Sequence, residues 1–190
     1  MIKKIVLWFF LALVLHAESL PLEGRKYGVE FNFPRLLTYS DSWKSISGTF
    51  SYFDHDEKIE IAVPWLIARH QNRYDSDNYD VKTIDVHYRK FLEDRLSGFY
   101  ISGFTRLAYI DGRLQDENMR QKTLKLGIGV GLGVRILPEN SRFYWGFGLY
   151  VGRYLGNQNE IYKTRDFDFL IYDDIPIIVD FDFLKFGYAF

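Results

Sequence analysis

Hydrophobic and polar positions alternate along the segment from Leu124 to Leu137, which reads LKLGIGVGLGVRIL. The even positions from Leu124 to Ile136 are all aliphatic, whereas the odd positions from Lys125 to Arg135 hold glycines between these two cations. A period of two predicts a β-strand with one apolar face. Residues 143–155 repeat the alternation after the turn sequence PENSR, so the two segments form a predicted hairpin.

The same alternation, less regular, recurs along the chain and predicts eight strands. We expect them near Lys26–Phe33, Lys44–Phe53, Lys58–Ala68, Val81–Leu92, Phe99–Ile110, Thr123–Leu137, Phe143–Leu155 and Pro176–Phe190. Pro64 in the third strand and a change of phase at Phe183–Leu184 in the last predict a bulge or a bend at each place.

Short and long connections alternate between the predicted strands. The short ones read DHDE, EDRLS and PENSR, and the longer, polar ones include RHQNRYDSDNYD and DGRLQDENMRQ. An even number of strands with short turns at one end and long loops at the other is typical of bacterial outer-membrane barrels. We therefore predict an all-β fold: an eight-stranded antiparallel up-and-down transmembrane β-barrel with short periplasmic turns and longer extracellular loops.

A soluble eight-stranded barrel of the lipocalin type is the main alternative, because it shares the strand number and the alternation. Its apolar face would point inward, and the glycines of the segment 124–137 would then lie on an exposed surface, where glycine weakens a strand. In a membrane barrel the aliphatic face meets lipid, and inward glycines make room for larger polar groups in a narrow interior. The glycine pattern therefore favours the membrane barrel.

The N-terminal sequence MIKKIVLWFFLALVLHAES has the order of a secretory signal peptide: two lysines, an apolar run and then small residues. The apolar run is too short for a spanning helix with these flanks, which makes a retained anchor helix the weaker alternative. We predict a cleaved signal peptide over residues 1–19, cut between Ala17 and Ser19, and a single barrel domain over residues 20–190. The expected location is the outer membrane of a Gram-negative bacterium.

Net charge and cysteine content reduce the number of partners and sites to consider. The formal net charge is −1, which gives no electrostatic reason to expect nucleic acid as a partner. The chain has no cysteine, so disulfides and thiolate metal sites are excluded.

If the apolar face meets lipid, the opposite face lines the lumen and carries many charges. The inward ionisable residues are Glu30, Glu60, Asp85, His87, Arg89, Arg106, Lys125, Arg135, Asp180, Asp182 and Lys185. Folding neighbouring strands about their connections places Asp85 opposite Arg106, and Arg106 opposite Lys125. Asp180 or Asp182, from the last strand, could balance the excess positive charge.

Two interpretations of this network stay open. Buried charges must pair or be neutralised, which favours an ionic plug that fills the lumen. The alternative is a narrow, charge-lined path for an ion or a small solute.

The sequence offers no catalytic residues, metal site or cofactor site that we would assign. His70 begins a long loop near Asp75, Ser76 and Asp77, and this group superficially resembles the outer-rim residues of barrel enzymes that modify lipid A. His55 lies in a short turn and His87 in the lumen. The acidic residues of the last long loop could collect a divalent cation, although a solvated loop is the better interpretation; they are Asp166, Asp168, Asp173 and Asp174.

The last residues, LKFGYAF, resemble the terminal signal by which bacterial outer-membrane barrels are recognised for assembly. Leu184, Phe186, Tyr188 and Phe190 alternate, and the terminal residue is aromatic.

Two longer segments resemble the hairpins of small uncharacterised outer-membrane β-barrel families: VHYRKFLEDRLSGFYISGFTRL, and GIGVGLGVRIL followed by FYWGFGLYVGRYL. The resemblance implies the fold and the location, and it implies no activity. We therefore expect a non-enzymatic barrel with a structural or surface-interaction role. Its expected partners are outer-membrane lipid, lipopolysaccharide and the barrel-assembly machinery, without nucleic acid and without a cofactor. A narrow channel is the first alternative, and a lipid A-modifying enzyme is the least favoured.

Overall fold

The computed structural model describes residues 25–33, 43–71, 78–93, 95–114, 119–138, 141–156 and 177–190. The predicted signal peptide and most residues of the long connections lie outside this part of the chain. The strands are β1 (Tyr27–Asn32), β2 (Trp43–Asp54), β3 (Ile59–Gln71), β4 (Asn78–Phe91), β5 (Gly98–Leu114), β6 (Met119–Ile136), β7 (Phe143–Leu155) and β8 (Ile177–Ala189). No helix within the described ranges is long and apolar enough to cross a membrane.

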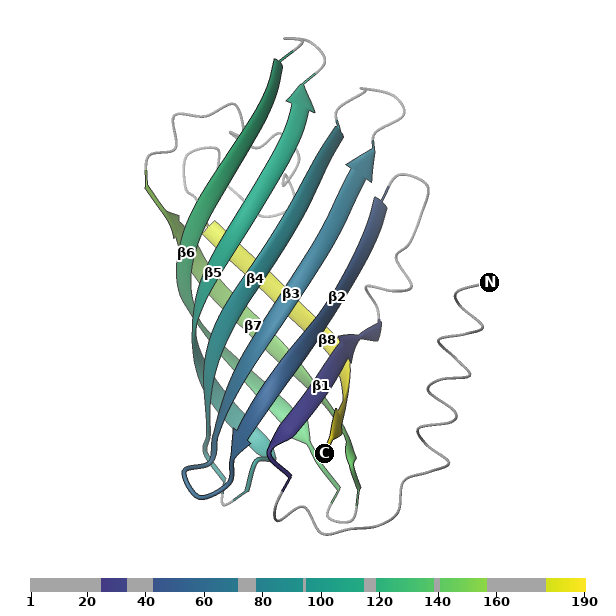
Figure 1. The fold of residues 1–190 in the computed structure, drawn as a ribbon. Coiled ribbons are helices and arrows are strands. Elements are labelled where there is room, and N and C mark those ends of the chain that lie inside the picture. Colours follow the sequence, from purple (N-terminus) through teal and green to yellow (C-terminus); the bar gives the residue numbers. More distant parts are fainter. Residues whose placement is uncertain are drawn as a thin grey trace, which may run out of the picture.

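The eight strands form one closed barrel in which each strand pairs antiparallel with its neighbour in sequence (Figure 1). β1 closes the barrel against β8. At this seam the Tyr27 amide donates to the Phe190 carbonyl (3.1 Å), and the Phe190 amide donates back to the Tyr27 carbonyl (2.9 Å). The predicted all-β, eight-stranded, up-and-down antiparallel barrel is confirmed.

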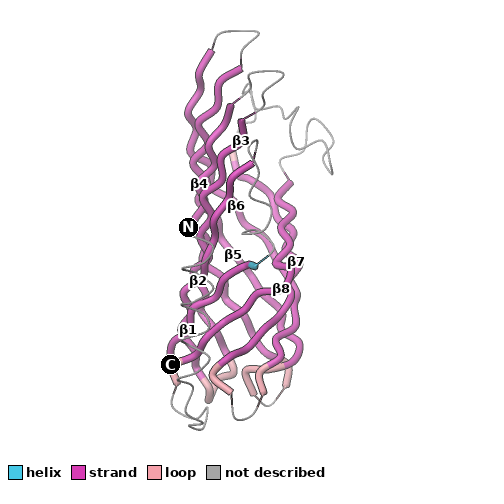
Figure 2. Tube along the Cα trace, turned by 90° about the vertical axis from the view of Figure 1, so that its right-hand side faces the viewer, coloured by secondary structure: helices cyan, strands magenta, loops and turns pink. Residues whose placement is uncertain are grey.

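Several strands run further into the long-connection end than the sequence predicted. β4 begins at Asn78 instead of Val81, and only residues 115–118 separate β5 from β6. The polar stretch DGRLQDENMRQ is therefore largely strand. The sequence is polar at both odd and even positions there, so it lacks apolar alternation, while backbone pairing continues. Figure 2 shows this side of the barrel rising above the end of β7.

The predicted irregularity in the last strand is a β-bulge. Gly146 pairs with Lys185, but Gly148 pairs with Asp182, so β8 has one extra residue in this interval. Leu184, within the bulge, has a φ of 51°, in the left-handed region that a leucine rarely adopts.

The bulge or bend expected at Pro64 is replaced by a gap in pairing without a change of register. Ala62 pairs with His87 and Trp65 with Ile84, which is one continuous register, and the pairs at Val63 and Pro64 are missing from the β3–β4 ladder. Proline has no amide hydrogen to donate, so a gap on one side accommodates it without an inserted residue.

The barrel is apolar outside and charged inside. Val130 on the outer face is 68% exposed, whereas Glu60 and Arg89 on the inner face are 0% and 1% exposed. Charged side chains are almost never fully buried in a protein unless they are paired. The large exposed apolar residues in the middle of the strands include Ile46, Phe50, Ile67, Ile84, Val86, Ile101, Leu107, Leu126, Ile128, Leu132, Val151, Phe181 and Phe183.

Inward glycines leave space for aromatic rings from neighbouring strands. A Cβ atom on Gly131 would lie 2.2 Å from the Tyr150 ring, and one on Gly129 would lie 2.4 Å from the Phe104 ring. The sequence predicted that the space would be taken by larger polar groups. Rings take most of it because the charges gather in two separate layers, described below.

We expect Gly131→Val to destabilise the barrel, because overpacking a filled interior costs about 1–3 kcal/mol. The control is Gly103→Val on the outer face of β5, where nothing lies within 4 Å of an added Cβ. The measurement is the free energy of unfolding in urea, followed by tryptophan fluorescence. Equal losses in the two variants would contradict the proposed role of the inward glycine.

Candidate functional site: two ionic layers inside the barrel

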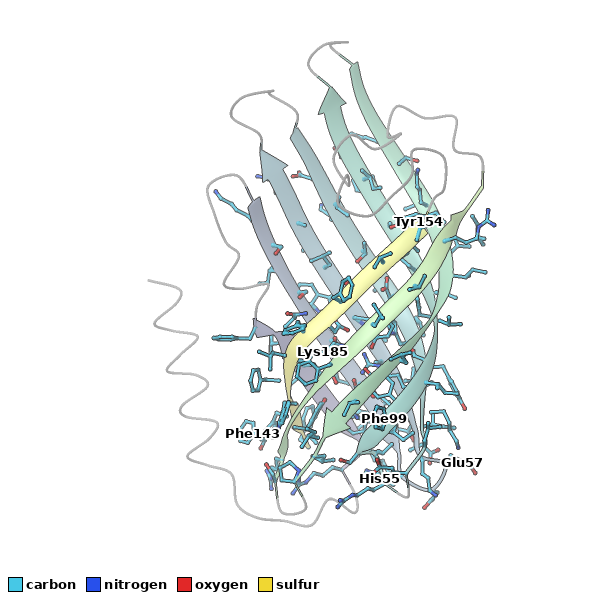
Figure 3. The ribbon with its side chains drawn as sticks, turned by 180° about the vertical axis from the view of Figure 1, so that it is seen from behind. His55, Glu57, Phe99, Phe143, Tyr154 and Lys185 are labelled. Atoms are coloured by element: carbon cyan, nitrogen blue, oxygen red, sulfur yellow. The ribbon has the colours of Figure 1, made fainter. Side chains whose placement is uncertain are left out.

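The lower ionic layer lies toward the short-turn end of the lumen. It comprises three acids and three cations from five strands: Glu30, Glu60, Arg89, Arg135, Asp182 and Lys185. All six side chains are buried. Figure 3 shows Lys185 between the short turn that carries His55 and Glu57 and the level of Tyr154, nearer the other end.

Glu30 and Glu60 hold the cations of this layer together. Arg135 Nη2 donates to Glu30 Oε1 at 2.9 Å and to Glu60 Oε2 at 2.6 Å. Arg89 Nη1 donates to Glu60 Oε1 at 3.1 Å, and Lys185 Nζ lies 3.5 Å from Glu30 Oε2. Since each carboxylate contacts cations from different strands, the layer ties opposite walls of the barrel together.

The bulge in β8 completes the lower layer. Residues three apart on a regular strand point to opposite faces, so Asp182 and Lys185 could not both face inward without an extra residue between them. With the bulge, both side chains are buried, and they form an ion pair. Asn32 adds a hydrogen bond from its Nδ2 to Asp182 Oδ1, at 3.4 Å. An unusual backbone conformation at Leu184 is thus linked to a charge pair.

Aromatic rings surround Arg135 and close the short-turn end below it. Its guanidinium carbon lies 4.4 Å from the Tyr144 ring centre, 5.0 Å from Phe91 and 5.2 Å from Phe53. Cations attract the faces of such rings, most strongly when desolvated. The three rings belong to a buried apolar cluster with Leu96, Tyr100, Leu137 and Ala189.

The upper ionic layer lies toward the long-connection end and comprises Asp85, Arg106 and Asp180. Arg106 Nε and Nη2 donate to the two oxygens of Asp85, at 2.9 Å and 2.7 Å. The same Nη2 donates to Asp180 Oδ2 at 2.6 Å. The guanidinium therefore links β5 to β4 on one side and, across the lumen, to β8 on the other.

His87 lies in the aromatic zone between the two layers. Its ring stacks on Phe104, with centres 5.1 Å apart, and meets Tyr150 edge to face at 4.6 Å. Its Nε2 is 3.4 Å from Asp85 Oδ2. The Tyr150 hydroxyl is in turn hydrogen-bonded to the Tyr100 hydroxyl, at 3.0 Å. Rings and ion pairs thus occupy successive levels of the lumen.

The structure corrects one predicted pairing. Asp85 does lie opposite Arg106, but Arg106 lies opposite Gly127, and Lys125 lies opposite Ala108. The β5–β6 register differs by two residues because the strands continue to Leu114 and Met119, beyond the loop expected after Gly112. The partner that balances Arg106 is Asp180, one of the two acids named from sequence, while Asp182 pairs with Lys185.

The inward aromatic residues are the part of the site that sequence reasoning missed. Tyr144, Tyr150 and Phe104 face the same lumen as the charges, and their alternation with glycine was visible in the sequence. What was not visible is which glycine each ring covers, because that depends on the register between strands.

The comparisons with known proteins add no relative. No protein-family model matches the chain, and no significant match was found among curated proteins or among solved structures. The structure confirms one part of what the resemblance to small outer-membrane barrel families implied, namely the eight-stranded closed barrel.

The candidate chemical residues outside the lumen form no described site. The side chain of His70, the residues Asp75, Ser76 and Asp77, and the acidic positions of the last long loop lie outside the described residues. His55 Nε2 donates to the Arg25 carbonyl at 2.6 Å, a contact between the short turn and the chain before β1. Within the described ranges, no three His, Cys, Asp or Glu side chains are grouped to hold a metal ion.

Little open space remains within the lower ionic layer. A cavity of about 10 Å³ is lined by Glu30, Arg89, Tyr100, Val134, Arg135, Tyr144, Gly146 and Lys185. That volume is close to the minimum needed for one water molecule. It is too small for a hydrated ion.

We expect Glu60→Gln to destabilise the protein by about 3–5 kcal/mol, because removing one partner of a buried ionic group leaves an uncompensated charge. The matched control is Asp80→Asn, which removes an acid from the exposed Arg69–Asp80 pair on the outer face and should change stability little. Urea unfolding curves of the two variants provide the comparison. Similar losses in both would show that the lower ionic layer does not hold the barrel together.

Proposed function

We propose that the protein is an integral β-barrel of a bacterial outer membrane whose lumen is closed by an ionic and aromatic plug, and that it acts through its surfaces without catalysing a reaction. The observation that carries this proposal is the inverted distribution of side chains, with paired charges inside and aliphatic groups outside. Soluble monomers rarely expose apolar patches larger than a few hundred Å². In a lipid bilayer the aliphatic outer face would contact acyl chains instead of water.

The height of the apolar band fits a bilayer. On β3 the outward positions from Ile59 to Ile67 are apolar, and Arg69 follows on the same face. This length is close to the roughly 9–11 residues that a tilted strand needs to cross the hydrocarbon core. The exposed Arg69 would then mark one edge of the band.

A belt of outward rings at the short-turn end supports the same orientation. Neighbouring ring centres lie 5.1–6.4 Å apart along the series Tyr52, Tyr27, Phe190, Tyr188 and Phe143. Aromatic side chains concentrate where a barrel meets the headgroup layer. Phe186 and Tyr188 on the outer face of the last strand, and Phe190 directly after it, belong to the proposed assembly signal, so they would be available to the barrel-assembly machinery during insertion.

The plug favours a closed barrel over the alternative of a narrow channel. The lower layer contains three acids and three cations, so it presents no excess charge to select an ion. The bonds of Arg106 to Asp85 and Asp180 close a second level. We therefore place the interaction surface of the proposed function outside the lumen.

We expect Val130→Lys to prevent stable insertion, because a lysine facing lipid near the bilayer midplane costs about 2–4 kcal/mol. Val130→Leu, which keeps the position apolar, should insert normally. The measurement is flotation of refolded protein with lipid vesicles, together with the gel mobility of unheated samples. In a water-soluble barrel an exposed lysine would do no harm, so a soluble, folded Val130→Lys protein and a wild type that does not float would contradict the proposal.

We expect the inserted wild-type protein to be electrically silent in a planar bilayer, since both ionic layers block the lumen. Flotation of the same preparation confirms insertion. Discrete, reproducible current steps that change in an Arg106→Ala variant would instead make the lumen a path for ions, and would replace the plugged barrel with the channel.

A further inference from the structure

Basic residues gather on the outer face near the long-connection end. The exposed cations there are Lys44 on β2, Arg69 on β3, Lys82 on β4, Lys122 on β6 and Arg153 on β7, and we call them the basic belt. Arg69 and Lys122 are both 58% exposed at their side chains. The outward acids described at the same end are Asp80 and Asp111, which are only partly exposed.

Strand register brings most of these charges into one row. The directly paired positions are Lys44 with Arg69, Arg69 with Asp80, Asp80 with Asp111, and Asp111 with Lys122. The strands lean in the barrel wall, so the row climbs from β2 toward the tall ends of β5 and β6 (Figure 1).

Both acids of the row already bind cations of the belt. Arg69 holds Asp80 with two hydrogen bonds, of 2.7 Å and 3.1 Å, and Lys122 Nζ lies 3.9 Å from Asp111. Like charges directly opposite each other on neighbouring strands are unfavourable. Among the described side chains of this surface, the five cations of the belt outnumber the two acids, Asp80 and Asp111, and Lys44 and Arg69 lie side by side.

The belt adjoins the apolar band on the same face. An exposed apolar residue lies on the same strand as each cation, two positions closer to the short-turn end. These residues are Ile46 after Lys44, Ile67 before Arg69, Ile84 after Lys82, Leu124 after Lys122 and Val151 before Arg153. A ligand that covers both surfaces must combine an apolar body with an anionic head. An amphiphile has this chemistry, whereas a soluble acidic peptide would leave the adjoining aliphatic groups uncovered.

We propose that the basic belt binds the phosphate groups of anionic membrane lipids whose acyl chains lie against the apolar band. This inference rests on the proposed membrane location and adds to it a lipid preference at one rim of the barrel. Basic residues next to a membrane surface each contribute on the order of 1 kcal/mol of attraction to anionic lipid, equivalent to about a fivefold change in binding. Lys44, Arg69 and Lys82 are the central residues, because their strands are neighbours.

The test measures lipid preference around the inserted protein. Tryptophan fluorescence is quenched by brominated phosphatidylglycerol or brominated phosphatidylcholine in mixed vesicles, which gives the relative association constant of the two lipids. At low salt we expect the wild type to prefer phosphatidylglycerol by about fivefold or more. The preference should weaken at high salt, which screens exposed charges.

The belt variant is Lys44→Gln/Arg69→Gln/Lys82→Gln, and we expect its relative constant to fall to about one. The matched control removes three exposed or partly exposed cations at the short-turn end, Lys26→Gln/Lys90→Gln/Arg95→Gln, and should keep most of the preference.

The outcomes separate this inference from the proposed function. A wild type that inserts but shows no lipid preference, or a control that loses as much as the belt variant, overturns the belt and leaves the membrane barrel intact. A wild type that does not insert overturns both. If the belt variant loses chemical cross-linking between copies and its lipid preference is unchanged, the surface binds a second copy of the chain, and the lipid assignment is wrong.

Discussion

Pairing of buried charges is the constraint on which the rest of this structure depends. A carboxylate removed from water costs several kcal/mol unless a cation and further hydrogen bonds compensate it. Glu60 on β3 is 0% exposed and can exist as a charged group only because Arg89 on the neighbouring strand β4 and Arg135 on β6 reach it. These contacts require one particular register around the barrel, since a shift by one residue would turn the charges outward.

Other features of the lumen follow from this constraint. The bulge at Leu184 lets Asp182 and Lys185 share the inner face. The rings of Tyr144, Phe91 and Phe53 enclose Arg135 and separate it from the short-turn end. Inward glycines give those and the neighbouring rings their space. With charges and rings filling the interior, the aliphatic side chains have only the outer face.

The period-two alternation predicted the strands and their closure well, because side-chain direction in a strand follows directly from position. It also placed Asp85 opposite Arg106, since the turn between β4 and β5 is short and fixes the register. The Arg106–Lys125 pairing was wrong because the β5–β6 connection is shorter than its polar composition suggested. Contacts across the lumen, such as Arg106 with Asp180, depend on the curvature of the whole barrel and on a bulge whose effect on register cannot be read from the local sequence.

Because the chain has no cysteine, single cysteines can be introduced for spin labelling, which gives the most direct test of whether the aliphatic outer face lies in lipid. Single cysteines at outward positions of β6, from Lys122 through Ile128 and Val130 to Leu132, can each carry a nitroxide spin label in vesicles. Collisions with oxygen, which concentrates in lipid, are compared with collisions with a water-soluble nickel complex. We expect oxygen to dominate at Ile128, Val130 and Leu132, and the nickel complex to dominate at Lys122. Access of the nickel complex to all four positions would contradict this expectation, because the aliphatic face would then be in water.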